Sequence, residues 1–240
     1  MSSTGKRHAA LRELVDPGRK YALDAGLEII SKCGTAKFDE TVEVAIRLGV
    51  NPRQADQMVR GAVSLPYGTG KSVRVVVFAE GDAARAAEEA GADFVGGMEL
   101  VQKIQKEGWV DFDKAVAVRS MMAKVGRLGR VLGPRGLMPN PKSGTVVSPD
   151  GVAEVVRAVK GGRVDFRVER AGIIHAGIGK ASMPTDQIRA NLLSLVGTLI
   201  RLKPSSAKGA YMRSIALSTT MGVGVRIDPN EAVRLAAETR

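Results

Sequence analysis

Hydrophobic and polar residues alternate along residues 41–48, which read Thr-Val-Glu-Val-Ala-Ile-Arg-Leu. A period of two is typical of a β-strand with one buried face. The same alternation returns over residues 164–169 and 214–227, whereas residues 188–202 carry apolar side chains at helical spacing. An earlier amphipathic stretch predicts a helix that ends near Gly34. The two ends of the chain therefore predict an antiparallel sheet accompanied by amphipathic helices.

The middle of the chain has a different pattern. Residues 73–79 form an almost continuous apolar run, as in a strand buried on both faces. Further strand-like and helical segments then alternate up to residue 159, which indicates a parallel α/β unit. We therefore predict two domains. Residues 1–68 plus 160–240 form a discontinuous α+β domain, and residues 69–159 form an inserted three-layer, Rossmann-like α/β domain. Glycines at both connections favour a hinge.

Charge narrows the choice of partners. Among 240 residues, 36 are Lys or Arg and 25 are Asp or Glu, so the net charge is +11. This excess favours nucleic acid or an anionic membrane surface as the partner. Aromatic residues make up only 4% of the chain, which argues against a platform of several rings for stacking single-stranded bases.

Several classes of protein are excluded by what the sequence lacks. The single cysteine, Cys33, allows no internal disulfide, and with only two histidines it predicts no zinc site of the usual Cys/His type. No apolar run reaches the ~18 residues of a membrane span, and residues 1–11 lack the apolar core of a signal peptide. We expect a cytoplasmic protein with no metal, no cofactor and no membrane partner.

The most distinctive segment is residues 126–146, where glycines and prolines alternate with cations and no acidic residue interrupts. Its cations are Arg127, Arg130, Arg135 and Lys142. Glycine lets a backbone approach a partner closely, and cations that neutralise phosphates release counterions. The segment therefore indicates contact with a polyanion, although a solvated basic loop is an open alternative.

Two apparent nucleotide-binding motifs fail. Residues 68–72 (Gly-Thr-Gly-Lys-Ser) resemble the end of a phosphate-binding loop, but Leu65 replaces a required glycine and a strand follows where a helix should begin. Residues 177–182 end in Ser182 where a dinucleotide fingerprint needs its third glycine, so we expect a turn beside a strand. We expect His175 to be a packed or edge histidine. With no catalytic set visible, we predict that the chain is not an enzyme.

Two further stretches carry chemistry suited to RNA. In residues 35–43, Lys37 can meet a phosphate and Phe38 can pack on a ribose or base. In residues 214–222, Gly222 allows close approach. Hydroxyls that can bond phosphates or 2′-hydroxyls are those of Thr41, Ser214, Ser218 and Thr220. Folded RNA is read mainly through shape, phosphates and 2′-hydroxyls, which suits small polar side chains. Serine and threonine also simply suit strands, so the residues alone leave both interpretations open.

Residues 128–141, Leu-Gly-Arg-Val-Leu-Gly-Pro-Arg-Gly-Leu-Met-Pro-Asn-Pro, resemble the signature of the family of the first protein of the large ribosomal subunit. Residues 35–44, 56–65, 90–97 and 219–222 are similar to the same family in the same order. The resemblance covers nearly the whole chain. Residues 118–120 depart from the family pattern, which leaves the role of the surface near Arg119 open. The tail after Pro229 is longer than the family pattern, and its role is open as well.

The resemblance implies both the fold and the function. Members of this family have the same two-domain arrangement and belong to the 50S subunit. They bind the mobile stalk of 23S rRNA beside the E site and assist release of deacylated tRNA. Bacterial members also repress translation of their own operon mRNA. The resemblance thus implies a structural, ribosome-bound protein of the cytoplasm, which we expect to be a monomer off the ribosome.

The resemblance also assigns site residues. The matching rRNA contacts are Lys37, Phe38, Thr41 and Glu43 on one strand, and Ser214, Thr220, Met221 and Gly222 on the other. Glu43 is acidic, so we expect it to orient a neighbour or bond a hydroxyl. Arg167 and Lys180 are added from their charge and place. The four cations of residues 126–146 are expected to contact tRNA or a second part of the rRNA.

Two other functions remain to be weighed. A Rossmann-like block could belong to a nucleotide-using or RNA-processing enzyme, against which the failed motifs argue. A translational repressor with no ribosomal role would carry the same RNA-binding residues.

Overall fold

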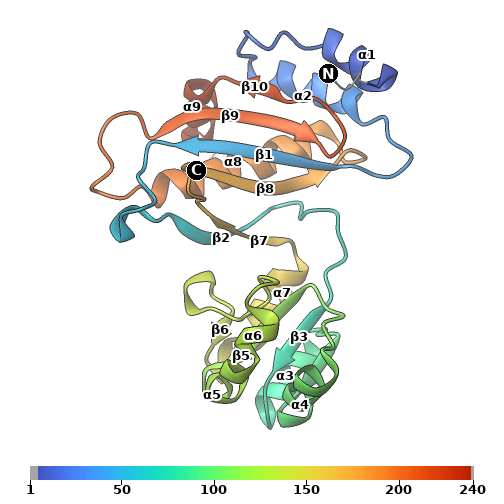
Figure 1. The fold of residues 1–240 in the computed structure, drawn as a ribbon, viewed down its shortest axis with the longest axis vertical. Helices are drawn as coiled ribbons and strands as arrows, with labels where there is room; N and C mark the ends of the chain where they lie inside the picture. Colours follow the sequence, from blue (N-terminus) through green and yellow to red (C-terminus); the bar gives the residue numbers. More distant parts are fainter. Residues whose placement is uncertain (1–4, 239–240) are drawn as a thin grey trace. The chain divides into compact units, whose positions relative to one another are not determined.

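The computed structural model describes residues 5–238, which fold into two compact units (Figure 1). The first unit comprises Met1–Gly70 and Val164–Arg240, and the second comprises Lys71–Arg163. Both divisions fall a few residues later than the predicted ones at 68 and 159. At the second division, helix α7 (Val152–Lys160) continues to Lys160 and strand β7 (Arg163–Arg167) begins only at Arg163. The predicted fold class, α+β together with α/β, is confirmed.

The first unit is built on a four-stranded antiparallel sheet in the order β10-β9-β1-β8. Its strands are β1 (Thr41–Leu48), β8 (Ile173–Lys180), β9 (Met212–Thr219) and β10 (Val225–Ile227). Its helices are α1 (Lys6–Glu13), α2 (Leu23–Cys33), α8 (Thr185–Arg201) and α9 (Pro229–Glu238). Strand β1 lies between β8 and β9, so the two strands that pair with its edges both come from the far end of the sequence.

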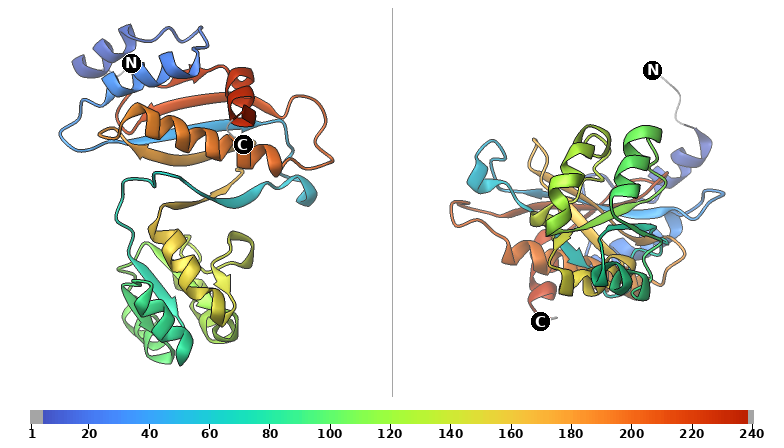
Figure 2. Two further views of the ribbon diagram at one scale, coloured as in Figure 1. Left: turned by 180° about the vertical axis from the view of Figure 1, so that it is seen from behind. Right: turned by 90° about the horizontal axis from the view of Figure 1, so that it is seen from below.

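The alternation along β1 decides which face of the sheet is covered. Val42, Val44 and Ile46 are fully buried, whereas Glu43 and Arg47 are exposed. The buried side chains pack with those of α2 and α8 in one core. Figure 2 shows α8 and α9 along one face of the sheet, and the described helices leave the other face open.

A second, two-stranded sheet of the first unit pairs β7 with β2 (Arg60–Ser64). A short 3₁₀ helix, η1 (Ala55–Gln57), precedes β2. Strand β2 was not predicted, because only Val63 of its five residues is buried and the apolar alternation is too weak to detect.

The second unit has a parallel sheet in the order β4-β3-β5-β6. Its strands are β3 (Val75–Phe78), β4 (Phe94–Gly96), β5 (Lys114–Val118) and β6 (Val146–Val147). Helices α3 (Asp82–Glu89) and α7, with the turn η5 (Pro149–Gly151), contact each other in one layer. Helix α4 (Met98–Glu107) contacts the short helices after β5 in the other. All four residues of β3 are completely buried, as its continuous apolar run predicted.

The glycine-rich segment is only partly a loop. Four short helical pieces follow β5: η2 (Arg119–Met121), α5 (Met122–Val125), η3 (Gly126–Leu128) and α6 (Gly129–Leu132). The helical pieces over residues 119–132 confirm the helix predicted over residues 120–132, which leads into the glycine-proline loop. The reason is that Val125, Leu128 and Leu132 recur at helical spacing and are all fully buried. Residues 133–140 are irregular, and η4 (Pro141–Ser143) follows.

The prediction of a turn at residues 177–182 was wrong in part. Gly177–Lys180 are the last residues of β8, and only the residues after Lys180 leave the strand. Gly177 and Gly179 fit this strand because the backbone passes close to Thr41 and to Met183. His175 lies on β8, at the edge of the sheet, with its side chain 60% exposed.

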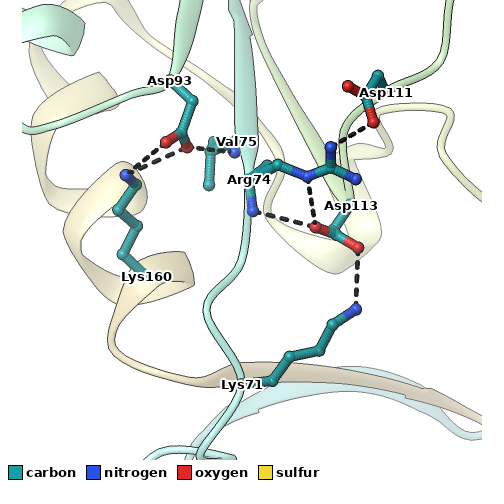
Figure 3. A network of polar contacts seen from close by, with 7 residues as sticks. All are labelled: Lys71, Arg74, Val75, Asp93, Asp111, Asp113 and Lys160. Atoms are coloured by element: carbon teal, nitrogen blue, oxygen red, sulfur yellow. Dashed lines mark hydrogen bonds and ion pairs between the residues drawn. The ribbon is translucent and has the colours of Figure 1, made fainter.

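Ion pairs fasten the beginning of the second unit (Figure 3). The carboxylate of Asp113 accepts hydrogen bonds from Lys71 Nζ at 2.9 Å and from the backbone N of Arg74 at 3.1 Å. The guanidinium of Arg74 also pairs with Asp111. The Lys71 hydrogen bond, the backbone N–H and the nearby positive charges lower the pKa of Asp113 despite its partial burial.

A second carboxylate, that of Asp93, links the start of β3 to the end of helix α7. Asp93 accepts a hydrogen bond from the backbone N of Val75 at 2.7 Å and pairs with Lys160 Nζ at 3.1 Å. Burial alone would raise the pKa of Asp93, but these partners lower it. Lys71 and Lys160, near the two ends of the second unit, are thus both anchored beside the start of β3.

Within residues 5–238, no helix is both long and apolar enough to cross a membrane. The described side chains of His, Cys, Asp and Glu also form no group of three that could hold a metal ion.

Candidate nucleic-acid interface

The two predicted RNA-binding stretches meet at one end of the four-stranded sheet. Strand β1 begins at Thr41, which lies opposite Lys180 at the end of β8. The next residue, Val42, lies opposite Thr219 at the end of β9. Antiparallel pairing therefore brings the loop before β1 and the turn after β9 together. We call this region the contact cluster; it comprises Lys37, Phe38, Thr41, Lys180, Thr220 and Met221.

Glu40 lies beneath the contact cluster. Its side chain is only 1% exposed, and each carboxylate oxygen accepts a hydrogen bond from a backbone N–H. Oε1 lies 2.9 Å from the N of Ala36, and Oε2 lies 2.8 Å from the N of Met221. Burial would raise the pKa of Glu40, but these hydrogen bonds and the charge of Arg7 outweigh it and lower the pKa. Glu40 is therefore a buried anion that joins the two loops.

Thr41 and Thr220 are tied together as well. The backbone N of Thr41 donates to Thr220 Oγ1 at 3.0 Å, and the backbone N of Thr220 donates to Thr41 O at 3.1 Å. The Thr220 hydroxyl, predicted to bond RNA, thus already accepts a hydrogen bond within the protein. An RNA group that binds Thr220 would therefore share this hydroxyl with the backbone N–H of Thr41.

Lys180 is held inside the cluster. Its Nζ lies 3.1 Å from Asp39 O and 3.1 Å from Thr41 Oγ1, so two of its three donors are occupied by the protein. The Asp39 carboxylate in turn accepts from the Ser182 hydroxyl at 2.8 Å. The loop before β1 is therefore fixed against β8 on this side.

Two large apolar side chains rise from this fixed base. Phe38 is 55% exposed and Met221 is 48% exposed, although both are hydrophobic. Lys37, beside Phe38, is also exposed. An apolar ring, a polarisable thioether and a cation on one rigid surface are suited to the faces of bases or riboses and to a nearby phosphate.

Helix α1 adds a residue that sequence reasoning missed. Arg7 donates from Nη1 to Thr35 Oγ1 and from Nη2 to Met221 O, both at 3.4 Å. The only sequence signal was the basic composition of residues 6–15. Beside it, a cavity of about 550 Å³ is lined by His8, Arg12, Val15, Pro17 and Gly222–Gly224.

Other predicted contacts lie farther along the sheet or away from it. Glu43 lies on the open face opposite Ser218, directly next to the cluster. Ser214 lies opposite Arg47, at the far end of β1, so the structure does not bring it to the cluster. Arg167 ends β7 in the two-stranded sheet, just before the turn that leads to the opposite end of β8. Residue type and family resemblance could not distinguish these positions, which depend on the strand register.

Gly222 is a glycine for a reason within the protein. A Cβ placed there would lie 2.2 Å from Thr219 Oγ1 and 3.3 Å from Cys33 Cβ. Thr219 and Cys33 are both buried, so a larger residue would disturb the turn itself. The prediction that Gly222 contacts RNA stays a prediction, but a substitution at Gly222 cannot test it cleanly.

The second unit carries a separate cationic surface. Arg127, Arg130 and Arg135 are all exposed, and Lys142 lies in η4 with a side chain outside the described part of the structure. Gly126 and Gly129 have helical dihedral angles, and a Cβ at either would meet nothing within 4 Å. Nothing among the described residues therefore requires glycine at these two positions.

A discontinuous α+β unit interrupted by a parallel α/β unit, with lysines and an exposed aromatic ring where its strands end, is an architecture suited to a nucleic-acid-binding protein. The chain matches the model of the Ribosomal protein L1p/L10e family over residues 29–223, and it belongs to that family.

Two relatives show how far the similarity extends. The chain is 52% identical over 229 residues to the large ribosomal subunit protein uL1 of Desulfosudis oleivorans, covering 95% of this chain and 97% of the relative. It is also 52% identical over 228 residues to the large ribosomal subunit protein uL1 of Bdellovibrio bacteriovorus, covering 95% and 96%. The family is one of structural, non-enzymatic proteins, which decides against the enzyme alternative.

Proposed function

We propose that this chain is a structural protein of the large ribosomal subunit, bound to the mobile stalk of 23S rRNA beside the E site in the cytoplasm. Family membership and the names of its relatives support this proposal. The single observation that carries it is the exposure of Phe38 and Met221 on loops locked together by Glu40. Two exposed apolar side chains on hydrogen-bonded loops are suited to a surface that packs on RNA.

The first test is direct binding. The purified full chain should bind a transcript of the 23S stalk tightly, and its affinity should fall with salt by a slope of about 0.7–0.9 per phosphate neutralised. The same chain should sediment with 50S subunits. Absence of sedimentation, with RNA binding intact, would instead favour a repressor with no ribosomal role.

The two units are proposed to have different tasks. The first unit makes the main rRNA contacts, because the unit that carries the tightest contacts must stay fixed while the unit hinged to it moves. The second unit, through Arg127, Arg130 and Arg135 together with Lys142, contacts E-site tRNA or a second rRNA segment. This contact assists release of deacylated tRNA.

The division is testable with shortened chains. Residues 1–70 joined by a short linker to 164–240 should bind stalk RNA with most of the full affinity, and residues 71–163 should bind it weakly. Tight binding by the second unit together with an inert joined chain would reverse the assignment. Circular dichroism of both proteins provides the folding control.

We also propose that the contact cluster represses translation of the chain's own operon mRNA, since one surface can bind two RNAs of the same shape. The free protein acts as a monomer in this role. An mRNA leader that binds competitively with stalk RNA would support this, whereas simultaneous binding of both RNAs would contradict it.

A further inference from the structure

Glu40 joins three segments that end at the contact cluster. Its carboxylate accepts from Ala36 in its own loop and from Met221 after β9. Its main-chain oxygen accepts from the backbone N of Ala181, after β8, at 2.8 Å. The hydrogen bond to Met221 connects residues 181 positions apart in the sequence.

Met221 is consequently held from both sides of its backbone. Glu40 accepts from its N–H, while Arg7 of helix α1 donates to its carbonyl oxygen at 3.4 Å. The side chain is left 48% exposed above this fixed backbone. On the other loop, Phe38 lies between Ala36 and Glu40, both of which take part in the same hydrogen bonding.

We propose that Glu40 is the positioning residue of the RNA-binding surface: its buried carboxylate fixes the loop before β1 to the turn after β9, so that Phe38 and Met221 are presented at a set separation. Because Glu40 is buried, it acts through these residues and makes no RNA contact itself. This inference rests on the proposed function and deepens it. It adds a residue outside the set that the sequence identified.

The chemistry of a carboxylate explains why this position carries an acid. Two separate N–H groups must each be given an acceptor, and an ionised carboxylate has two acceptor oxygens in a fixed geometry. A glutamine has one acceptor oxygen, and its NH₂ would face the second N–H donor. The lowered pKa of Glu40 keeps both oxygens as acceptors at neutral pH. Burying an anion merely for stability is usually a poor solution, which favours a role in geometry.

The first measurement concerns the free protein and needs no RNA. In the Glu40→Gln variant, hydrogen exchange measured by NMR should show that the amide of Ala36 or of Met221 loses protection. Amides in the core of β1, such as that of Val44, should stay protected. Unchanged protection of both amides would overturn the proposal.

The second measurement is affinity for the 23S stalk transcript. Glu40→Gln should weaken binding by roughly tenfold or more, as expected when a charge-assisted hydrogen bond is lost and an N–H is left unpaired. In a chain that already carries Phe38→Ala and Met221→Ala, Glu40→Gln should add little further loss, because nothing remains to be positioned. Fully additive losses would show a general structural defect and overturn the proposal.

A matched control exists in the second unit. Asp93 is likewise a carboxylate that accepts from a backbone N–H, that of Val75, and faces a cation, Lys160. Asp93→Asn should lower the melting temperature while leaving affinity for the transcript unchanged. An equal affinity loss in Asp93→Asn and Glu40→Gln would contradict a specific role for Glu40.

A second variant covers failure of the first to fold. Glu40→Asp keeps the charge but is one methylene shorter, so it cannot reach both N–H groups, and it should weaken binding in the same direction. A folded Glu40→Asp protein with parental affinity would overturn the proposal. Should the parent chain itself fail to bind the transcript, the proposed function would fall, while the amide exchange would still decide whether Glu40 holds the loops.

Discussion

Lys180 donates a hydrogen bond to Thr41, with its Nζ 3.1 Å from Thr41 Oγ1. The cation that sequence reasoning assigned to RNA is therefore mainly engaged within the protein, where it ties β8 to the start of β1. Lys37 on the same surface is exposed. Two lysines of equal charge thus have different surroundings, and their removal should have different effects.

Removing these lysines should separate positioning from phosphate contact. Lys37→Met should lower the slope of log affinity against log salt by about 0.7–0.9, the contribution of one phosphate. Lys180→Met should weaken binding with less change of slope, because it loosens the loop. Filter binding of the stalk transcript across a salt series measures both, and a larger slope change for Lys180→Met would show that Lys180 neutralises phosphate.

Phe38→Ala should weaken RNA binding by about 1–3 kcal/mol, the usual contribution of one stacked aromatic side chain. The melting temperature should hardly change, since the ring is 55% exposed. Tyr67 is equally exposed and lies in the same unit, so Tyr67→Ala is the matched control. Equal affinities for Phe38→Ala and the parent chain would remove Phe38 from the interface.

Gly126→Ala and Gly129→Ala should stabilise the second unit by about 0.5–1 kcal/mol each, because alanine is favoured over glycine at helical positions and the space is empty. Both should nevertheless weaken contact with tRNA or rRNA if an RNA backbone approaches there. Urea unfolding and crosslinking to ribosome-bound RNA measure the two effects. Ala123→Gly, an exposed position of α5, is the reverse control and should destabilise without affecting crosslinking.

Acid should weaken the second unit through Asp113. Its pKa is lowered below the ordinary value of 3.8 in the folded chain, so its stabilisation is present above that value and is lost as the pH falls through the lower, folded pKa. Asp113→Asn should therefore be less stable at neutral pH and should show a flatter stability profile below pH ~4. Denaturant unfolding at a series of pH values tests this. Asp82, whose side chain is fully exposed, provides the control substitution Asp82→Asn.

Sequence reasoning succeeded where one period dominated a segment. The alternation of residues 41–48 matched β1 residue for residue, and the apolar run around Val75–Phe78 identified a strand buried on both faces. It failed for β2 and β6, which are short and carry few buried side chains. The helix predicted over residues 120–132 was confirmed, because Val125, Leu128 and Leu132 recur at helical spacing and are buried.

The contact cluster was predictable only in part. Residue type and family resemblance indicated Phe38, Met221 and their neighbours, and the structure brings those together. Ser214 and Arg167 lie away from these residues, because their positions are set by strand register and not by local sequence. Glu40 and Arg7 escaped notice because their roles arise from contacts with residues near the other end of the chain.

The placement of β1 between β8 and β9 has a consequence for how the protein is made. During synthesis β1 emerges early, yet both of its partners lie beyond the whole second unit, whose own sheet uses only residues 71–163. That unit can therefore fold first, while β1 waits with unpaired edges. Glu40 meets Met221 only when the last strands have left the ribosome. The surface that their two loops form is thus complete only when most of the chain has been synthesised.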